Sequence, residues 1–241
     1  MEKVSQKDIE WLLNDSVNQS AGTKPTSSKK KKNLFFRLLM WGGMLLSMLV
    51  LPFFLLIRLS VYLNLEHQWN GWLALAAGGG ATVVLLLVYF LMVFRKAKNK
   101  KRIFRLGGSI ASVVVLGFCL YGLMYLSSVN SKSDNIREVY RSLHPILRVA
   151  VATTTLADGE LVVTDIGRQP DDYTSMGLAV NNTSLHYKQN DGFVHAIDLR
   201  TIDRSEWRNK ILEYSLSAMG FNTLRHVGTA DHLHVSLPFV E

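Results

Sequence analysis

Cysteine is nearly absent from this chain, and ionisable residues are absent from the centres of its three longest apolar runs. The single cysteine, Cys119, lies inside one run, so an internal disulfide is excluded. Each run is close to the ~20 residues that a helix needs to cross a bilayer. We therefore predict three transmembrane helices, at Leu38–Ile57, Trp72–Phe94 and Leu106–Leu126. Because no charge lies at their centres, these helices offer no ion pathway, which argues against a channel or transporter subunit.

Lysine and arginine are also absent from the segment between the first two runs, Ser60–Asn70. They are dense elsewhere: Lys29–Lys32 precede the first run, and seven more lie from Arg95 to Arg105. Short loops rich in Lys and Arg remain in the cytoplasm. We therefore expect a cytoplasmic N-terminus, and three crossings place the chain from Ser127 onward outside the cytoplasm. The expected location is the bacterial cytoplasmic (inner) membrane, with the C-terminal domain in the periplasm.

The net charge of +8 comes from the first half of the chain, which contains the N-terminal tail and the apolar runs. Residues 1–126 hold 16 Lys and Arg against 5 Asp and Glu, whereas residues 127–241 hold 11 against 14. The basic residues thus flank the apolar runs, and no nucleic-acid partner is expected. We divide the chain into a cytoplasmic tail (1–32), a membrane region (33–128) and an extracytoplasmic domain (129–241).

The cytoplasmic tail holds one short amphipathic stretch, Ser5–Asn14, followed by a linker rich in Ser, Thr and Lys. Ser5 and Asp8 match a capping box, and Ile9 and Leu12 share one helical face. Two interpretations stay open. The helix lies against the membrane lipid headgroups, or residues 5–14 bind a cytoplasmic partner protein.

The extracytoplasmic domain mixes helical and strand patterns, which predict a small α+β domain with an antiparallel sheet. Its clearest helix begins after Ser205 and ends at Gly220, with Trp207, Ile211 and Tyr214 on one apolar stripe. The other expected elements are a helix at 139–149 and strands at 161–166, 194–201, 221–227 and 232–237.

Six of the seven histidines lie in this domain, and two strands can bring some of them to an aspartate. Strand alternation gives Asp198 and His234 matching faces, and His186, in the preceding loop, can supply a third ligand. Two His and one carboxylate leave a fourth position for water, which is the arrangement of a catalytic zinc site. The alternative is that these are ordinary surface histidines.

The motifs that carry these residues are Ser184–Lys188, Ala196–Leu199 and Asp231–Ser236. In composition and order they resemble the motifs of the LAS zinc peptidases. That family includes bacterial D-alanyl-D-alanine carboxypeptidases and dipeptidases of the M15 type, and the metal-bearing Hedgehog domain. The resemblance implies a Zn²⁺ cofactor held by the three ligands just named.

The resemblance also implies three catalytic residues. Asp231, three residues before the last ligand, would be the general base, and His232 would support the transition state. Arg168, at the end of a segment similar to one in the family, would steady the substrate or the developing oxyanion. Two alternatives stay open: Asp231 belongs to a tight turn before the strand, and Arg168 anchors a turn at the surface.

One spacing departs from the family. Its first His and its Asp are seven residues apart, whereas His186 and Asp198 are twelve apart, and Gln189–Phe193 resembles an insertion. The insertion has a turn sequence, so it could form a loop that narrows or blocks the site. His195 is an alternative first ligand, although strand alternation points it away from Asp198. Asp191 keeps the usual spacing, but Asp would be unusual there.

These features predict a membrane-anchored zinc-dependent peptidase whose substrate is peptidoglycan, through its stem peptides or cross-links. It would be of the D-Ala-D-Ala carboxypeptidase or endopeptidase type. The alternative is a catalytically inactive M15-like domain that binds peptidoglycan or a partner protein as an anchor or sensor.

Overall fold

The computed structural model describes residues 6–7, 10–11, 34–175, 177, 179–228 and 231–238. Within the amphipathic stretch of the tail, the described residues Gln6, Lys7, Glu10 and Trp11 are helical. The remainder of that predicted helix lies outside the described residues. The chain divides into two compact units between Leu45 and Leu46, and the larger unit holds all the strands described below.

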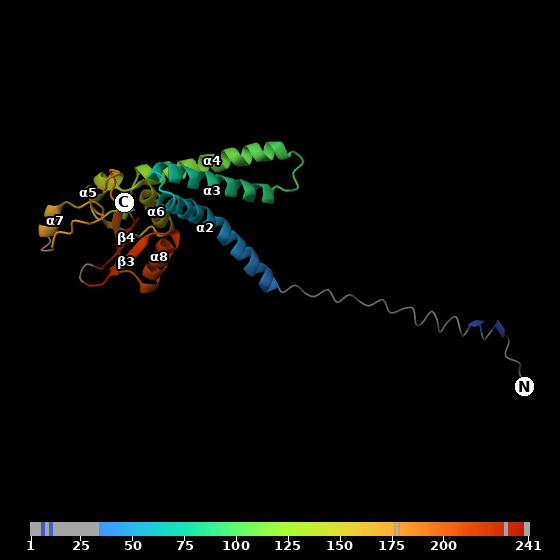
Figure 1. The fold of residues 1–241 in the computed structure, drawn as a ribbon. Coiled ribbons are helices and arrows are strands. Elements are labelled where there is room, and N and C mark those ends of the chain that lie inside the picture. Colours follow the sequence, from blue (N-terminus) through green and yellow to red (C-terminus); the bar gives the residue numbers. More distant parts are fainter. Residues whose placement is uncertain are drawn as a thin grey trace, which may run out of the picture. The chain divides into compact units, whose positions relative to one another are not determined.

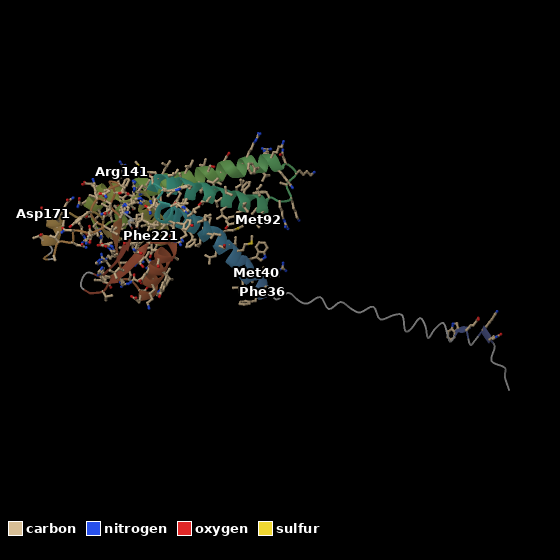
Figure 2. All side chains as sticks on the ribbon, viewed as in Figure 1. Phe36, Met40, Met92, Arg141, Asp171 and Phe221 are labelled. Carbon is tan, nitrogen blue, oxygen red and sulfur yellow. The ribbon has the colours of Figure 1, made fainter. Side chains whose placement is uncertain are left out.

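Three helices in the described part of the chain are long and apolar enough to span a membrane. They are α2 (Leu34–Glu66), α3 (Gly71–Val93) and α4 (Lys100–Met124). Apolar side chains project outward from them, as Phe36, Met40 and Met92 do in Figure 2, each more than half exposed. Such a surface suits lipid, and the prediction of three long apolar helices is confirmed. α2 is longer than expected because the helix continues past the apolar run.

α3 and α4 lie side by side along most of their length (Figure 1). α3 contains a run of small residues, Ala76–Ala81, and one of them, Gly78, packs against α2. A Cβ built on Gly78 would stand 2.5 Å from the Leu56 carbonyl oxygen and against the Ser60 hydroxyl. Only glycine permits so close an approach of the two helices.

After α4 the chain forms three short helical segments and then the longer α6 (Pro145–Ala157). The short segments are η1 (Ser128–Asn130), α5 (Asp134–Val139) and η2 (Tyr140–Ser142). The expected single helix at 139–149 is therefore wrong. Leu143 is extended, and His144, which precedes the proline, cannot easily adopt helical angles. That proline instead begins α6, where its missing N–H is not needed.

α6 is tied to the end of α4 by polar contacts. The Tyr140 hydroxyl donates to the carbonyl oxygens of Gly122 at 2.7 Å and Arg148 at 2.9 Å. Nη1 of Arg148 donates to the Leu123 carbonyl at 2.8 Å. The carbonyls of Gly122 and Leu123 belong to the last turn of α4, where no helical N–H is left to pair with them. The domain is thus joined to the third long helix through its backbone.

The domain contains a four-stranded antiparallel sheet in the order β1-β2-β4-β3. Its strands are β1 (Val163–Asp165), β2 (Ala196–Arg200), β3 (Asn222–His226) and β4 (His232–Ser236). All four predicted strands are present, each slightly shorter than expected. The small α+β domain beside a helical membrane region is confirmed. A short helix, α7 (Pro170–Ser175), follows β1 and was not expected.

The two faces of the sheet differ in chemistry. Ile197 and Leu199 of β2, with Leu233 and Val235 of β4, are at most 1% exposed and belong to the hydrophobic core. Because side chains alternate along a strand, the opposite face carries the polar residues between them. That face holds the candidate site.

α8 (Glu206–Met219) has the predicted bounds, with Gly220 in the left-handed conformation at φ 103°. The predicted apolar stripe is not the buried side of this helix. The stripe of Trp207, Ile211 and Tyr214 is more than half exposed. The buried face is instead formed by Asn209, Leu212, Leu216 and Met219. Three aromatic or aliphatic residues at helical spacing do not by themselves identify the core-facing side.

Candidate metal centre

The three predicted ligands converge at one point on the polar face of the sheet. Asp198 of β2 lies directly opposite His234 of β4 in the strand register, and His186 reaches them from the loop before β2. Nδ1 of His234 is 2.9 Å from Oδ1 of Asp198 and 3.2 Å from Nε2 of His186. Nε2 of His186 is 3.4 Å from the same Asp198 oxygen. The three side chains could together hold a metal ion.

These separations fit a tetrahedral ion. Ligand atoms about 2.0–2.1 Å from zinc in tetrahedral geometry stand roughly 3.3 Å from one another, and the three measured separations are close to that value. The donor set of two imidazoles and one carboxylate is also one that zinc accepts. The residues present therefore fit Zn²⁺.

The protonation states suit metal binding. Burial raises the pKa of Asp198, but its contacts with His186 and His234 and the charge of Arg168 outweigh burial, so the pKa lies well below its ordinary value. The carboxylate is therefore ionised, as a ligand must be. Nδ1 of His186 lies 2.6 Å from the Ile166 carbonyl oxygen, to which it donates, and this contact directs Nε2 at the cluster.

Arg168 is brought to the site, where it contacts the ligand carboxylate. Its Nη2 lies 2.5 Å from Oδ2 of Asp198, and its Nε lies 2.5 Å from Oδ2 of Asp165. The guanidinium therefore fixes the Asp198 oxygen that faces away from the two histidine ligands. Asp165, in β1, belongs to the same network, although sequence reasoning gave it no role.

His232 also lies at the site. Its Nε2 is 3.8 Å from Oδ2 of Asp198, and its side chain is 25% exposed. The ring stacks on that of His226, with centroids 4.7 Å apart. His226 was not predicted as a site residue, although it is paired with His232 in the register of β3 and β4. Pairing the two strands through their connecting turn would have identified it.

Asp231 is not brought to the ligands. Asp231 is the residue just before β4. Strand alternation directs its side chain to the same side as that of Leu233 and away from that of His234. Its carboxylate accepts from Nε and Nη2 of Arg225 at 2.6 and 2.9 Å, and from the Thr201 hydroxyl at 2.6 Å. Arg225 above all lowers the pKa of Asp231 to about 2. The base role implied by the resemblance would require Asp231 to leave Arg225.

The extra residues between the first two ligands form a tight loop. The Gln189 N–H donates to the Phe193 carbonyl at 2.8 Å, and the Gly192 N–H donates to the Gln189 carbonyl at 2.9 Å. His195 follows the loop, with its Nε2 2.9 Å from Oδ2 of Asp191. The structure therefore places His186, and neither His195 nor Asp191, beside Asp198.

Comparison with known proteins gives no relative. No family model, no curated protein and no solved structure matches this chain. An assignment of function consequently depends on the residues of the site.

Proposed function

We propose that this protein is a membrane-anchored, zinc-dependent peptidase that acts on peptidoglycan stem peptides or cross-links. The observation that carries the proposal is the convergence of His186, Asp198 and His234 in a domain that follows three potential membrane helices. With a cytoplasmic N-terminus, that domain faces the cell wall, where stem peptides are the abundant peptide substrate.

The residues around the ligands support a reaction at a peptide bond. Zn²⁺ held by the three ligands supplies an activated water and polarises the scissile carbonyl. His234 and His232 are each about a quarter exposed, so a substrate approaches from their side. In this proposal His232 donates a hydrogen bond to the developing oxyanion. Arg168 acts in this arrangement as a positioning residue, because it holds the free oxygen of Asp198.

One observation favours a second function, an inactive domain that binds peptidoglycan or a partner protein. Hydrolysis needs a proton acceptor near the attacking water, and Asp231 is held by Arg225 on the other face of the sheet. Asp165 is the carboxylate joined to the cluster through Arg168, and it is 22% exposed. A peptidase would use Asp165 or His232 as the proton acceptor, or Asp231 would have to leave Arg225 to take that role.

The test uses the full chain purified in mild detergent, supplied with Zn²⁺ and incubated with peptidoglycan sacculi. A peptidase releases D-alanine or cleaves cross-links, and His234→Ala reduces that rate by at least about 100-fold because a ligand is lost. The same variant should lose one equivalent of bound zinc per chain. The matched control is His67→Ala, since His67 is an exposed residue outside the site.

Two other outcomes decide between the proposals. Co-sedimentation with sacculi that His234→Ala abolishes, without any cleavage product, would support the binding domain instead. Zinc content that is the same in the wild-type protein and in His234→Ala would overturn both functions.

A further inference from the structure

A second group of metal-ligating side chains lies outside the site of Asp198. It consists of His144, Asp191 and His195, and one ligand atom from each lies within 4.8 Å of the others. We propose that these three residues form a second, structural site for a divalent metal ion, with Zn²⁺ as the ion that two imidazoles and one carboxylate favour. The proposal of a second site does not depend on whether the first site hydrolyses peptides.

The separations within this group suit a shared ion. Oδ2 of Asp191 is 2.9 Å from Nε2 of His195 and 3.9 Å from Nε2 of His144. The two imidazole rings have centroids 4.7 Å apart. A tetrahedral zinc ion requires roughly 3.3 Å between ligand atoms. The two nitrogen–oxygen separations bracket that value.

Backbone hydrogen bonds hold the three residues together. The His144 N–H donates to the Val194 carbonyl at 2.9 Å, and the Val194 N–H donates to the Ser142 carbonyl at 2.8 Å. Oδ1 of Asp191 accepts from the Phe193 N–H at 3.0 Å, which leaves Oδ2 directed at the histidines. The ligands are therefore positioned before any ion binds, which lowers the cost of binding.

The burial of the group also indicates a ligand. His144 and His195 are 1% and 2% exposed, whereas the Asp191 carboxylate is 32% exposed and gives an ion access from solvent. Within the described residues, Nδ1 of His144 is a buried nitrogen with no hydrogen-bond partner. Burying an imidazole with an unmet nitrogen is costly. Because Nδ1 makes no hydrogen bond within the protein, a flip of the ring that presents Nδ1 to the ion would break no bond and would give this nitrogen a partner.

The surroundings of the site are compatible with a cation. Arg148 lies nearby, but it directs Nη1 to the Leu123 carbonyl and its guanidinium lies 5.4 Å from the Trp72 ring. Phe193 packs edge-on against His144, with ring centroids 5.9 Å apart, and forms an apolar wall. The ion would fasten the loop Gln189–Phe193 to the start of α6. That loop lies between two ligands of the first site, so its anchoring would fix their spacing.

The experiment measures zinc per chain by elemental analysis in the full chain, purified in detergent with any affinity tag removed. We expect two equivalents in the wild-type protein, one in Asp191→Asn and one in His234→Ala. The matched control is Asp134→Asn, an exposed aspartate whose loss should leave two equivalents. His144→Gln provides a second variant that should also retain one, and thermal unfolding of each variant checks that it folds.

The outcomes separate the two sites. Zinc content unchanged by both Asp191→Asn and His144→Gln would overturn the second site. If His234→Ala still lost zinc in that case, the proposed function would keep its support. Zinc lost in Asp191→Asn but fully retained in His234→Ala would support the second site and overturn the first.

Discussion

At the scale of single residues, Asp198 joins two sets of contacts. Its Oδ1 faces the ring nitrogens of His186 and His234, and its Oδ2 faces Arg168 and His232. A carboxylate held on both oxygens keeps one orientation, which a metal ligand needs. The sequence identified each of these residues separately, but only the structure shows which of them faces which oxygen of Asp198.

The contacts of Asp231 predict a loss of stability when its charge is removed. Hydrogen bonds from Arg225 lower its pKa from 3.8 to about 2. A carboxylate with a lowered folded-state pKa stabilises the fold above its unfolded-state pKa, and that stability disappears as the pH falls through the folded-state value. Asp231→Asn should therefore reduce the free energy of unfolding by roughly 1–2 kcal/mol at neutral pH. The reduction should shrink between about pH 4 and pH 2.

Guanidinium unfolding of the detergent-solubilised protein at several pH values measures this effect, with Asp134→Asn as the exposed control. Unchanged stability in Asp231→Asn, combined with loss of zinc-dependent hydrolysis, would contradict this expectation and restore Asp231 as the general base.

At the scale of elements, strand register decides which residues meet. Asp198 faces His234 only because β2 and β4 pair in the register Ala196↔Ser236, and a slip of one residue would turn the ligands toward the core. The hydrophobic face of the same strands fixes that register. The polar site and the apolar core are thus specified by one alternating pattern.

The end of α8 gives a prediction at this scale. Gly220 adopts φ 103°, a conformation that costs an L-residue roughly 1–2 kcal/mol. A Cβ at this position would also stand 2.8 Å from Cγ1 of Val61. Gly220→Ala should therefore lower the free energy of unfolding by more than about 1 kcal/mol. The control is Gly159→Ala, where a Cβ meets nothing within 4 Å, and thermal melts that coincide for the two variants would contradict the prediction.

At the scale of the whole molecule, the helices and the domain share one hydrophobic core. Leu56 and Val61 of α2 and Leu123 of α4 cluster with residues of α6 and the sheet, among them Leu147 and Val235. A fragment that begins after α4 would expose this surface to water, at a cost of roughly 25 cal/mol for each Å² of apolar area. The domain is therefore best studied in the full chain.

The distribution of Lys and Arg predicts the orientation of the whole chain. In a Cys119→Ser background, a membrane-impermeant maleimide added to intact cells should label Ser133→Cys, at the exposed start of the domain. It should not label Lys98→Cys, in the exposed basic loop between α3 and α4, until the cells are lysed. The opposite labelling pattern would place the domain in the cytoplasm and exclude peptidoglycan as its substrate.

The sequence predicted much of the fold because short-range rules determine it. Length and apolarity specified the three long helices, and alternation specified the four strands. Ser205 and Gly220 bounded α8, because helix ends depend on a few adjacent residues. The helix expected at 139–149 failed where a single proline redirected the backbone. The apolar stripe of α8 is exposed because packing partners, which the sequence does not display, decide which side of a helix is buried.

The sequence alone determined three long apolar helices and placed two histidines and an aspartate at intervals that led us to propose a metal site. Only the tertiary structure decided which of those side chains meet. It joined His186 to Asp198 across twelve residues, turned Asp231 toward Arg225, and gathered His144, Asp191 and His195 into a second group. The physical reason is that contacts distant in sequence depend on register and packing, which no local pattern specifies.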